Sequence, residues 1–303
     1  MMSRACSVSA RRVYSRARVC HCWGVARSTY YARQAGATGK SLPAAPRGRP
    51  PVVPDAILVA QIRTVLGEAE ALGWRGEGYR KVWARLRHRG TPTSKERVRR
   101  LMREHGLQAP HRVGKPRGPR SHDGTIIPDA PDRMWGTDAT QVVTRLEGTA
   151  TIFLAIDHFV GDLVGIHAAR PGTRYEALEP LHQGLREHFG PLREGVAEGL
   201  VVRHDHGAQY MSGHFQRELH FLGIESSPSF VRAPQGNGIA ERFVRTLKEQ
   251  LLWVRRFDTV EELRLALLEF KERYNRHWLL QRHDSQTPAA VRATHGDLLP
   301  MAA

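Results

Sequence analysis

The pattern of apolar and polar positions divides the chain into a helical part and a part in which strands alternate with helices. Between residues 55 and 106, apolar side chains recur every three or four positions, the spacing of amphipathic helices. This spacing predicts helices over residues 55–72, 77–90 and 95–106. Their apolar faces are Ile57, Ile62, Val65 and Leu66, then Tyr79, Val82, Trp83 and Leu86, and finally Val98, Leu101 and Met102.

Residues that start and end helices support these predictions. Asp55 follows Pro54 and is the expected N-cap of the first helix, while Ser94 is placed to cap the third. Gly90 ends the second helix, so only a short turn separates it from the third. Two helices joined by such a turn are typical of a helix-turn-helix, whose second helix enters the major groove of DNA.

The third predicted helix is strongly basic. Its cations are spread over the surface that the apolar stripe leaves free, and they are Lys95, Arg99, Arg100 and Arg103. We therefore predict that these four side chains bind DNA. A basic helical hairpin without a DNA ligand is the alternative, because such hairpins are common.

From residue 133 the apolar pattern becomes extended. Three short runs rich in β-branched and aromatic residues, 133–143, 148–159 and 162–170, are separated by turn-like residues. Alternating helices and strands follow, over 174–189, 199–205, 213–223, 223–230, 238–253 and 259–278. The order predicts an α/β fold whose sheet begins with an antiparallel meander.

Two stretches rich in Gly and Pro, residues 35–54 and 111–132, are the expected linkers. Before the first of them, GVARSTYYAR fits the second helix of another helix-turn-helix. We expect a basic N-terminal segment and linker over 1–50, a helix-turn-helix-like DNA-binding domain over 51–110, a linker over 111–130, a catalytic core with a C-terminal helix over 131–293, and a tail over 294–303.

The charge distribution agrees with this division. The net charge is +16, and residues 1–120 hold 26 Lys and Arg against 6 Asp and Glu, whereas residues 121–303 hold 20 against 24. Such asymmetry indicates a nucleic-acid-binding part joined to a different domain, although a solvated arginine-rich surface is the alternative. No apolar run approaches the roughly 18 residues of a membrane span, no secretory signal is evident, and the three cysteines are too few for a disulfide framework. We expect a cytoplasmic protein that does not enter the membrane.

Three carboxylates stand out by their positions. Asp138 lies within the first predicted strand, Asp205 ends the fourth, and Glu241 lies near the start of the long helix 238–253. Adjacent strands and a helix packed near their ends can bring such side chains together, and hard oxygen ligands suit Mg²⁺ or Mn²⁺. Two such ions about 3.5–4 Å apart catalyse phosphodiester chemistry, with Asp138 expected between them and the other two carboxylates outside. Singly, each carboxylate has a structural alternative: Asp205 as a turn cap and Glu241 as a helix-dipole partner.

Three sequence blocks carry a family resemblance. WGTDAT, HDHGAQY and GNGIAERF resemble the signature blocks of integrase-core transposases, which are similar to retroviral integrases, and 35 residues separate Asp205 from Glu241 as in that superfamily. Lys248, seven residues after Glu241, matches the family's basic residue, so Glu241, Arg245 and Lys248 are expected on one helix face. Over residues 55–293 the chain most resembles the second-frame protein of insertion sequences with two overlapping frames.

This resemblance implies a ribonuclease H-like mixed sheet flanked by helices, preceded by a small all-α helix-turn-helix domain. It implies two Mg²⁺ or Mn²⁺ ions held by the catalytic residues Asp138, Asp205 and Glu241, and DNA contacts by Arg245 and Lys248. The implied activity is cleavage at element ends and strand transfer into target DNA. Implied partners are double-stranded DNA, further copies of the chain and an upstream-frame protein, in a bacterial, nucleoid-associated setting.

Two other functions remain open. The chain fits an inactive transposase derivative that binds element ends as a repressor, or a ribonuclease H-like nuclease that cuts without joining. Intact Asp138, Asp205 and Glu241 disfavour the repressor, and the basic N-terminal part disfavours the simple nuclease. Asp157 is expected outside the metal-binding set, while His204 and His206 flank Asp205 and either orient a phosphate or support the turn.

Overall fold

The computed structural model describes residues 6–37, 51–110, 128–229 and 237–296. The chain forms two compact units, residues 1–52 and 53–303. Most of the two predicted linkers and of the predicted tail lies outside the described residues. Within the described ranges, no helix combines the length and the apolar character that crossing a bilayer requires.

The first unit contains two short helices, α1 (Arg16–Cys22) and α2 (Arg27–Ala37). Ser15 caps α1, because its side chain accepts a hydrogen bond from the backbone N–H of Arg18. The stretch GVARSTYYAR supplies the turn and the first part of α2. The order is therefore helix, turn, helix, as expected for this stretch.

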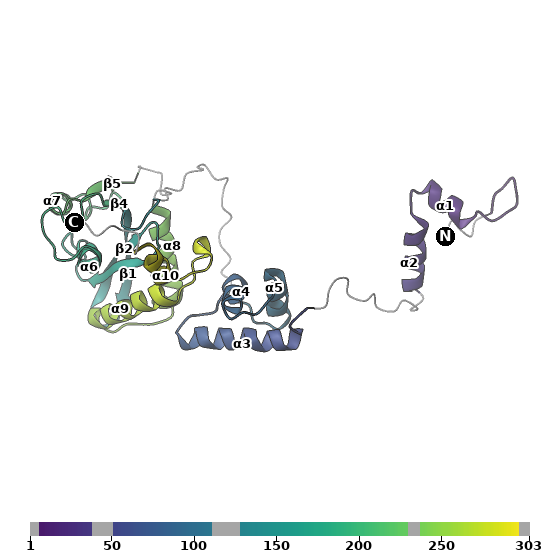
Figure 1. The fold of residues 1–303 in the computed structure, drawn as a ribbon, viewed down its shortest axis with the longest axis horizontal. Helices are drawn as coiled ribbons and strands as arrows, with labels where there is room; N and C mark the ends of the chain where they lie inside the picture. Colours follow the sequence, from purple (N-terminus) through teal and green to yellow (C-terminus); the bar gives the residue numbers. More distant parts are fainter. Residues whose placement is uncertain (1–5, 38–50, 111–127, 230–236, 297–303) are drawn as a thin grey trace. The chain divides into compact units, whose positions relative to one another are not determined.

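The second unit begins with three helices that share one apolar core (Figure 1). They are α3 (Asp55–Ala71), α4 (Tyr79–His88) and α5 (Lys95–Glu104), close to the predicted bounds. Val82, Leu86, Val98, Leu101 and Met102 are buried as expected. Ser94 caps α5 by accepting from the N–H of Arg97.

Two expectations for α3 are wrong. Ile57 is 52% exposed, and the neighbouring Leu58 and Val59 face the core instead. Asp55 is not the N-cap: Pro54 occupies that position and makes no side-chain bond, while Asp55 opens the helix and forms ion pairs with Arg97 and Arg100 of α5. The packing of α5 against the first turn of α3 decides the outcome at Asp55, because it offers this carboxylate two guanidinium groups.

A five-stranded mixed sheet follows, with the order β3-β2-β1-β4-β5. Its strands are β1 (Met134–Thr144), β2 (Gly148–Asp157), β3 (Leu163–Ala169), β4 (Val201–His204) and β5 (Glu225–Pro228). The first three pair antiparallel, whereas β4 runs parallel to β1 and β5 parallel to β4. The predicted ribonuclease H-like mixed sheet and its opening meander are confirmed.

Helices cover both faces of this sheet (Figure 1). On one face α8 (Gly238–Leu247) and α9 (Val260–His277) pack on Ile152, Leu154 and Ile156 of β2. On the other, α6 (Glu179–His188) and α7 (Gly213–Phe221) pack with Phe153 and Ala155. Because successive side chains of a strand point to opposite faces, β2 is buried on both sides, which explains its nearly continuous apolar sequence.

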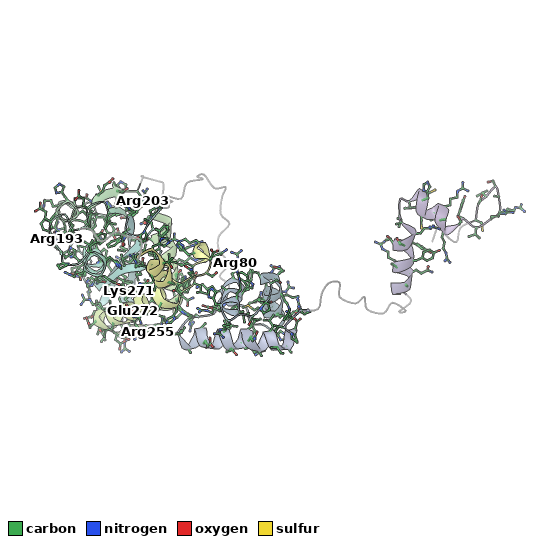
Figure 2. All side chains as sticks on the ribbon, viewed as in Figure 1. Arg80, Arg193, Arg203, Arg255, Lys271 and Glu272 are labelled. Carbon is green, nitrogen blue, oxygen red and sulfur yellow. The ribbon has the colours of Figure 1, made fainter. Side chains whose placement is uncertain are left out.

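Helix α9 also covers the edge of the sheet. Lys271 donates hydrogen bonds to the carbonyl of Val164 in β3, at 2.9 Å, and to the carboxylate of Glu187 in α6, at 2.7 Å (Figure 2). Lys271 lies on α9 and satisfies a free carbonyl of the edge strand β3. Its charge at this edge disfavours pairing with another chain.

The long helix predicted over residues 238–253 has a different form. It consists of α8 and of one π-helical turn over Lys248–Leu252. The predicted helix 174–189 likewise starts later, at Glu179. At the end of the described chain, a 3₁₀ turn (Gln281–His283) precedes α10 (Pro288–Gly296).

Contacts inside the second unit join α3–α5 to the sheet region. Trp74 is 2% exposed, and its ring lies 5.8 Å from that of Phe270 and 5.0 Å from that of Trp278. Trp74 is therefore part of the core under α8 and α9. Arg85 of α4 donates to the carbonyl of His277 at the end of α9.

Candidate active site

Asp138 lies on the face of β1 that α8 covers. Side chains alternate along the strand, so Trp135 and Ala139 join the core under α6 and α7, whereas Val142 joins the core under α8 and α9. Asp138 shares the face of Val142. Its Oδ1 accepts a hydrogen bond of 2.8 Å from the N–H of Ala139.

The pKa of Asp138 is shifted by burial and by charged neighbours. Burial, together with the negative charges of Asp205 and Glu241, raises this pKa to about 6, while Lys248 acts in the opposite direction. The fold thus brings into one electrostatic neighbourhood the three carboxylates that the sequence analysis singled out. They come from a strand, the end of a second strand and a helix, and lie up to about a hundred residues apart.

Asp205 directly follows β4 and is exposed. Its Oδ1 accepts a hydrogen bond of 2.7 Å from the N–H of Gly207, and a Cβ at position 207 would lie 2.8 Å from the same oxygen. The turn is therefore capped by Asp205, as the structural alternative anticipated, and glycine leaves room for the carboxylate. A cap through one oxygen leaves the second carboxylate oxygen available for another ligand.

His204 supports the same turn from inside. It is buried, and its Nδ1 donates to the carbonyl of Asp205 at 2.7 Å while Nε2 lies 2.9 Å from the hydroxyl of Ser226. Burial lowers the pKa of His204, which favours a neutral ring. Of the two roles left open for His204, the contacts favour support of the turn. His206 is exposed.

Glu241 occupies the first turn of α8 and is exposed. Partial burial raises the pKa of its carboxyl group. The dipole of the helix N-terminus acts in the opposite direction and favours the ionised form.

The three carboxylates have the chemistry of ligands for a divalent cation, but their side chains do not lie close enough together to surround one. Within the described ranges, no three His, Cys, Asp or Glu side chains are gathered closely enough to hold an ion as they stand. Carboxylates are nevertheless the ligands that Mg²⁺ and Mn²⁺ prefer, and a cation would relieve the repulsion and desolvation at Asp138. The donor chemistry of these residues thus fits a divalent cation.

The two predicted cations near Glu241 have different neighbours. Lys248 affects the charge of Asp138. Arg245 instead donates to Glu249 at 2.8 Å and lines a cavity of about 390 Å³ with Arg242 and residues of the C-terminal segment. The α-helix gives way to a π-helical turn at Lys248, and the common face expected for Glu241, Arg245 and Lys248 stays a prediction.

The predicted DNA-binding residues of α5 also differ from one another. Arg99 pairs with Glu96. Arg100 pairs with Asp55 and with Glu104, and both of its ion pairs measure 2.9 Å. The ammonium group of Lys95 lies 4.5 Å from the centroid of the Trp83 ring. Arg103 lines a cavity of about 320 Å³ together with other arginines of α5.

Comparisons with known proteins match both parts of the second unit. A family model described as an HTH-like domain matches residues 74–115, and one described as an integrase core domain matches residues 222–288. The transposase InsD of insertion element IS2D from Escherichia coli (strain K12) is 27% identical over 205 residues, which cover 65% of each protein. These matches show that the chain is similar to integrase-core transposases. The match spans about two thirds of the curated relative's length.

Solved structures similar to this chain include two retroviral integrase cores. The catalytic core of BIV integrase has a TM-score of 0.40 and 18% identity, and covers 55% of this chain and 99% of that one. The core of HTLV-2 integrase in complex with magnesium has a TM-score of 0.40 and 17% identity, and covers 54% and 97%. Scores this low add nothing to the fold assignment, which rests on the strand order and directions.

Asp157 belongs to a separate cluster of charged side chains. It is fully buried and accepts hydrogen bonds from the N–H groups of Asp132, Phe159 and Val160. Arg292 of α10 forms ion pairs with Asp132 and Asp162 beside it. Burial and the charge of Asp162 raise the pKa of Asp157 to about 7. Asp157 therefore has a structural role: it stabilises the cluster of aspartates to which Arg292 of α10 binds.

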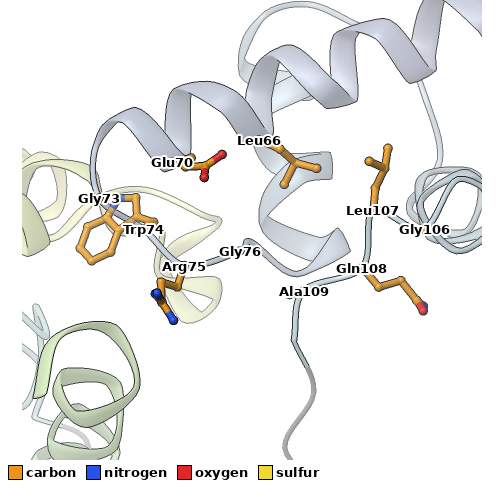
Figure 3. A pocket seen from close by; sticks show the side chains of 10 residues that line it. All are labelled: Leu66, Glu70, Gly73, Trp74, Arg75, Gly76, Gly106, Leu107, Gln108 and Ala109. Carbon is orange, nitrogen blue, oxygen red and sulfur yellow. The ribbon is translucent and has the colours of Figure 1, made fainter. Parts of the chain in front are cut away.

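A cavity of about 430 Å³ lies away from the three carboxylates, at the end of α3 (Figure 3). Its lining includes Glu70 as the one carboxylate, along with Trp74, Arg75 and the loop before residue 110. A single carboxylate offers no basis for metal-dependent chemistry there.

Two residues near the three carboxylates had no role from sequence reasoning. Tyr210 is fully buried on the face of β1 opposite Asp138, and burial together with the charges of Asp138 and Asp205 raises the pKa of its hydroxyl. Asn237 is buried at the N-cap of α8. An asparagine at a helix start ordinarily signals a cap, so only its tertiary contacts reveal another role.

Proposed function

We propose that this protein is a transposase that cleaves the ends of a DNA element and transfers them to target DNA. The proposal assigns the chemistry to Asp138, Asp205 and Glu241. The observation that carries it is the partial burial of Asp138 in the middle of β1, with the charges of Asp205 and Glu241 acting on its carboxyl group. The homology to InsD, which is named a transposase, supports the same activity.

In this proposal Asp138, Asp205 and Glu241 would hold two Mg²⁺ or Mn²⁺ ions. When bound, the ions activate the attacking oxygen and stabilise the leaving oxygen of the phosphodiester. Asp138 is already desolvated, so it interacts strongly with cations. Lys248 is placed to hold a DNA phosphate beside the carboxylates, and Arg245 contacts DNA further along the helix.

DNA binding in the proposal depends on the basic N-terminal part. Residues 1–54 contain 10 Lys and Arg and no Asp or Glu, so no carboxylate of this segment can neutralise them. Lys95 and Arg103 are the best placed of the predicted contacts on α5, with weaker contributions from the paired Arg99 and Arg100. Neutralising phosphates makes such binding strongly dependent on salt.

Assembly completes the proposal. Two element ends must be brought together, so we propose a homo-oligomer on DNA and association with an upstream-frame protein, in a bacterial, nucleoid-associated setting. The protein would act on double-stranded DNA of the element and of the target.

The test is nicking and joining of labelled element-end DNA in Mg²⁺, with the upstream-frame protein supplied as a fusion. Wild type is compared with Glu241→Gln and with the matched control Glu249→Gln, whose carboxylate pairs with Arg245. We expect activity in wild type and in the control and none in Glu241→Gln. Equal activity in all three would refute the assignment of Glu241.

Other outcomes identify the two remaining functions. Specific binding to the ends without cleavage in any variant would indicate an end-binding repressor. Cleavage without joining, lost in Glu241→Gln, would indicate a nuclease.

A further inference from the structure

Asn237 stands at the N-cap of α8, but its side chain does not cap the helix. An asparagine at this position ordinarily accepts a hydrogen bond from a backbone N–H in the first turn. Here no such side-chain bond forms. Instead, Nδ2 donates to the backbone carbonyl of Thr137 in β1, at 2.7 Å, and Asn237 is only 6% exposed. The side chain crosses from the helix to the strand.

The space for this crossing depends on Gly136. A Cβ at position 136 would lie 2.6 Å from Oδ1 of Asn237 and closer still to the ring of His158. Any other residue would therefore displace the amide or the histidine. The glycine of the WGTDAT block thus has a physical reason in the contact between β1 and α8.

The arrangement is unfavourable for the stability of the helix itself. Oδ1 of Asn237 is buried and has no hydrogen-bond partner among the described residues. A buried polar atom left without a partner lowers stability, and so does a missing N-cap bond. Stability of α8 alone does not explain why Asn237 makes the bond to Thr137.

The bond joins the two halves of the candidate active site. Thr137 immediately precedes Asp138, and Asn237 lies four residues, about one helical turn, before Glu241. We propose that Asn237 is a positioning residue that ties the start of α8 to β1 and so limits how far the Glu241 carboxylate can lie from that of Asp138 when divalent ions bind. This inference rests on the proposed function, because it needs both carboxylates to bind the ions.

Asn275 provides a matched control within the same core. It lies on α9 and bridges to β3, where Oδ1 accepts from the N–H of Leu163 at 2.9 Å and Nδ2 donates to its carbonyl at 3.0 Å. Both polar groups are satisfied, and neither residue flanks a proposed ligand. Asn275 is therefore a helix-to-strand amide bridge with a structural role.

The experiment measures Mn²⁺ binding by electron paramagnetic resonance on the full chain, in the absence of DNA. Wild type is compared with Asn237→Ala, Asn237→Ser, Asn275→Ala and Glu241→Gln, and urea unfolding is measured for each. Loss of a residue that orients a metal ligand typically weakens affinity by about 10–100-fold. We expect such a loss in Asn237→Ala, and a change within about twofold in Asn275→Ala.

Asn237→Ser separates positioning from stability. Serine is a good N-cap but is too short to reach Thr137, so the variant should recover stability while its Mn²⁺ affinity stays as low as that of Asn237→Ala. Wild-type affinity in both Asn237 variants, or an equal loss in Asn275→Ala, would overturn the positioning role while leaving the metal site intact. Unchanged Mn²⁺ binding in Glu241→Gln would overturn the proposed function, and the inference with it.

Discussion

Helices α5 and α8 are alike in sequence character and different in what their first turns do. Both are ten residues long and amphipathic, and each has one acidic residue in the first turn, Glu96 in α5 and Glu241 in α8. In α5, Ser94 caps the helix and Glu96 pairs with Arg99. In α8, the Asn237 side chain leaves the cap position and desolvation raises the pKa of Glu241.

The difference shows that the side-chain partners in the first turn can distinguish a helix start in a functional site from one with a purely structural role. At the start of α5, Ser94 and Glu96 both bind partners within their own helix. At the start of α8, Asn237 is directed at β1 and Glu241 acts on the charge of Asp138 instead. Departures from local stability of this kind are expected where a protein holds a functional site.

The largest effect should come from neutralising the two first-turn glutamates. Glu241→Gln should lower strand transfer by more than about 100-fold, because losing a ligand should exceed the 10–100-fold cost of losing a residue that orients one. Glu96→Gln should change the rate by less than about threefold, since its carboxylate pairs only at the surface. Rates of joining on element-end DNA, with circular dichroism to verify folding, measure both. A comparable loss in Glu96→Gln would remove the contrast between the helices.

Lys95 and Arg103 should differ in DNA binding from the arginines of α5 that form ion pairs. The double variant Lys95→Ala/Arg103→Ala should weaken binding about tenfold and reduce the slope of log K against log salt by up to about 0.9 for each phosphate that is no longer neutralised. Arg100→Ala should change the slope less, because Arg100 already pairs with Asp55 and Glu104. Fluorescence anisotropy on duplex DNA over a range of salt tests this ranking. A larger slope change in Arg100→Ala would show that its ion pairs open on DNA.

The helical part should also show a pH dependence that originates beside α5, in α4. The ammonium group of Lys81 is buried against the Trp278 ring, and this burial lowers the pKa of Lys81 to about 7. Between that value and the unfolded value, the folded chain binds fewer protons, so the free energy of unfolding rises with pH from about 7 upward. The rise should reach up to about 1 kcal/mol per pH unit.

Urea unfolding of wild type and Lys81→Met between about pH 6 and 9.5 isolates this effect, because the window spans the folded pKa and most of the approach to the unfolded one. The wild type should gain stability relative to the variant as the pH increases. Parallel curves for the two proteins would show that Lys81 keeps its charge in the folded state.

The smallest expected difference concerns the caps themselves. Ser94→Ala should lower the free energy of unfolding by about 1 kcal/mol, because the bond to the N–H of Arg97 is lost. Asn237→Ser should lie within about 0.5 kcal/mol of wild type, since a new cap offsets the lost bond to Thr137. Chemical denaturation measures both. A loss of about 2 kcal/mol or more in Asn237→Ser would mean that the bond to Thr137 holds α8 in place for stability.

Much of the fold was predictable because its signals are local. The apolar faces of α4 and α5, the cap at Ser94 and the buried runs of β2 and β3 all follow from periodicity. The errors arose where a partner distant in sequence decided the outcome. Asp55 left its predicted cap because α5 offered two arginines, and the π-helical turn at Lys248 has no signal that periodicity detects.

The sequence by itself determined the class of the fold, the basic character of the N-terminal part and the identity of three candidate carboxylates. Each of these depends on residue type and spacing, which the chain carries in linear form. Only the tertiary structure decided that the three carboxylates share one electrostatic neighbourhood, which arginines of α5 are already neutralised, and that Asn237 reaches Thr137. The physical reason is that desolvation, ion pairing and a hydrogen bond across about a hundred residues depend on distances that exist only after the helices pack on the sheet.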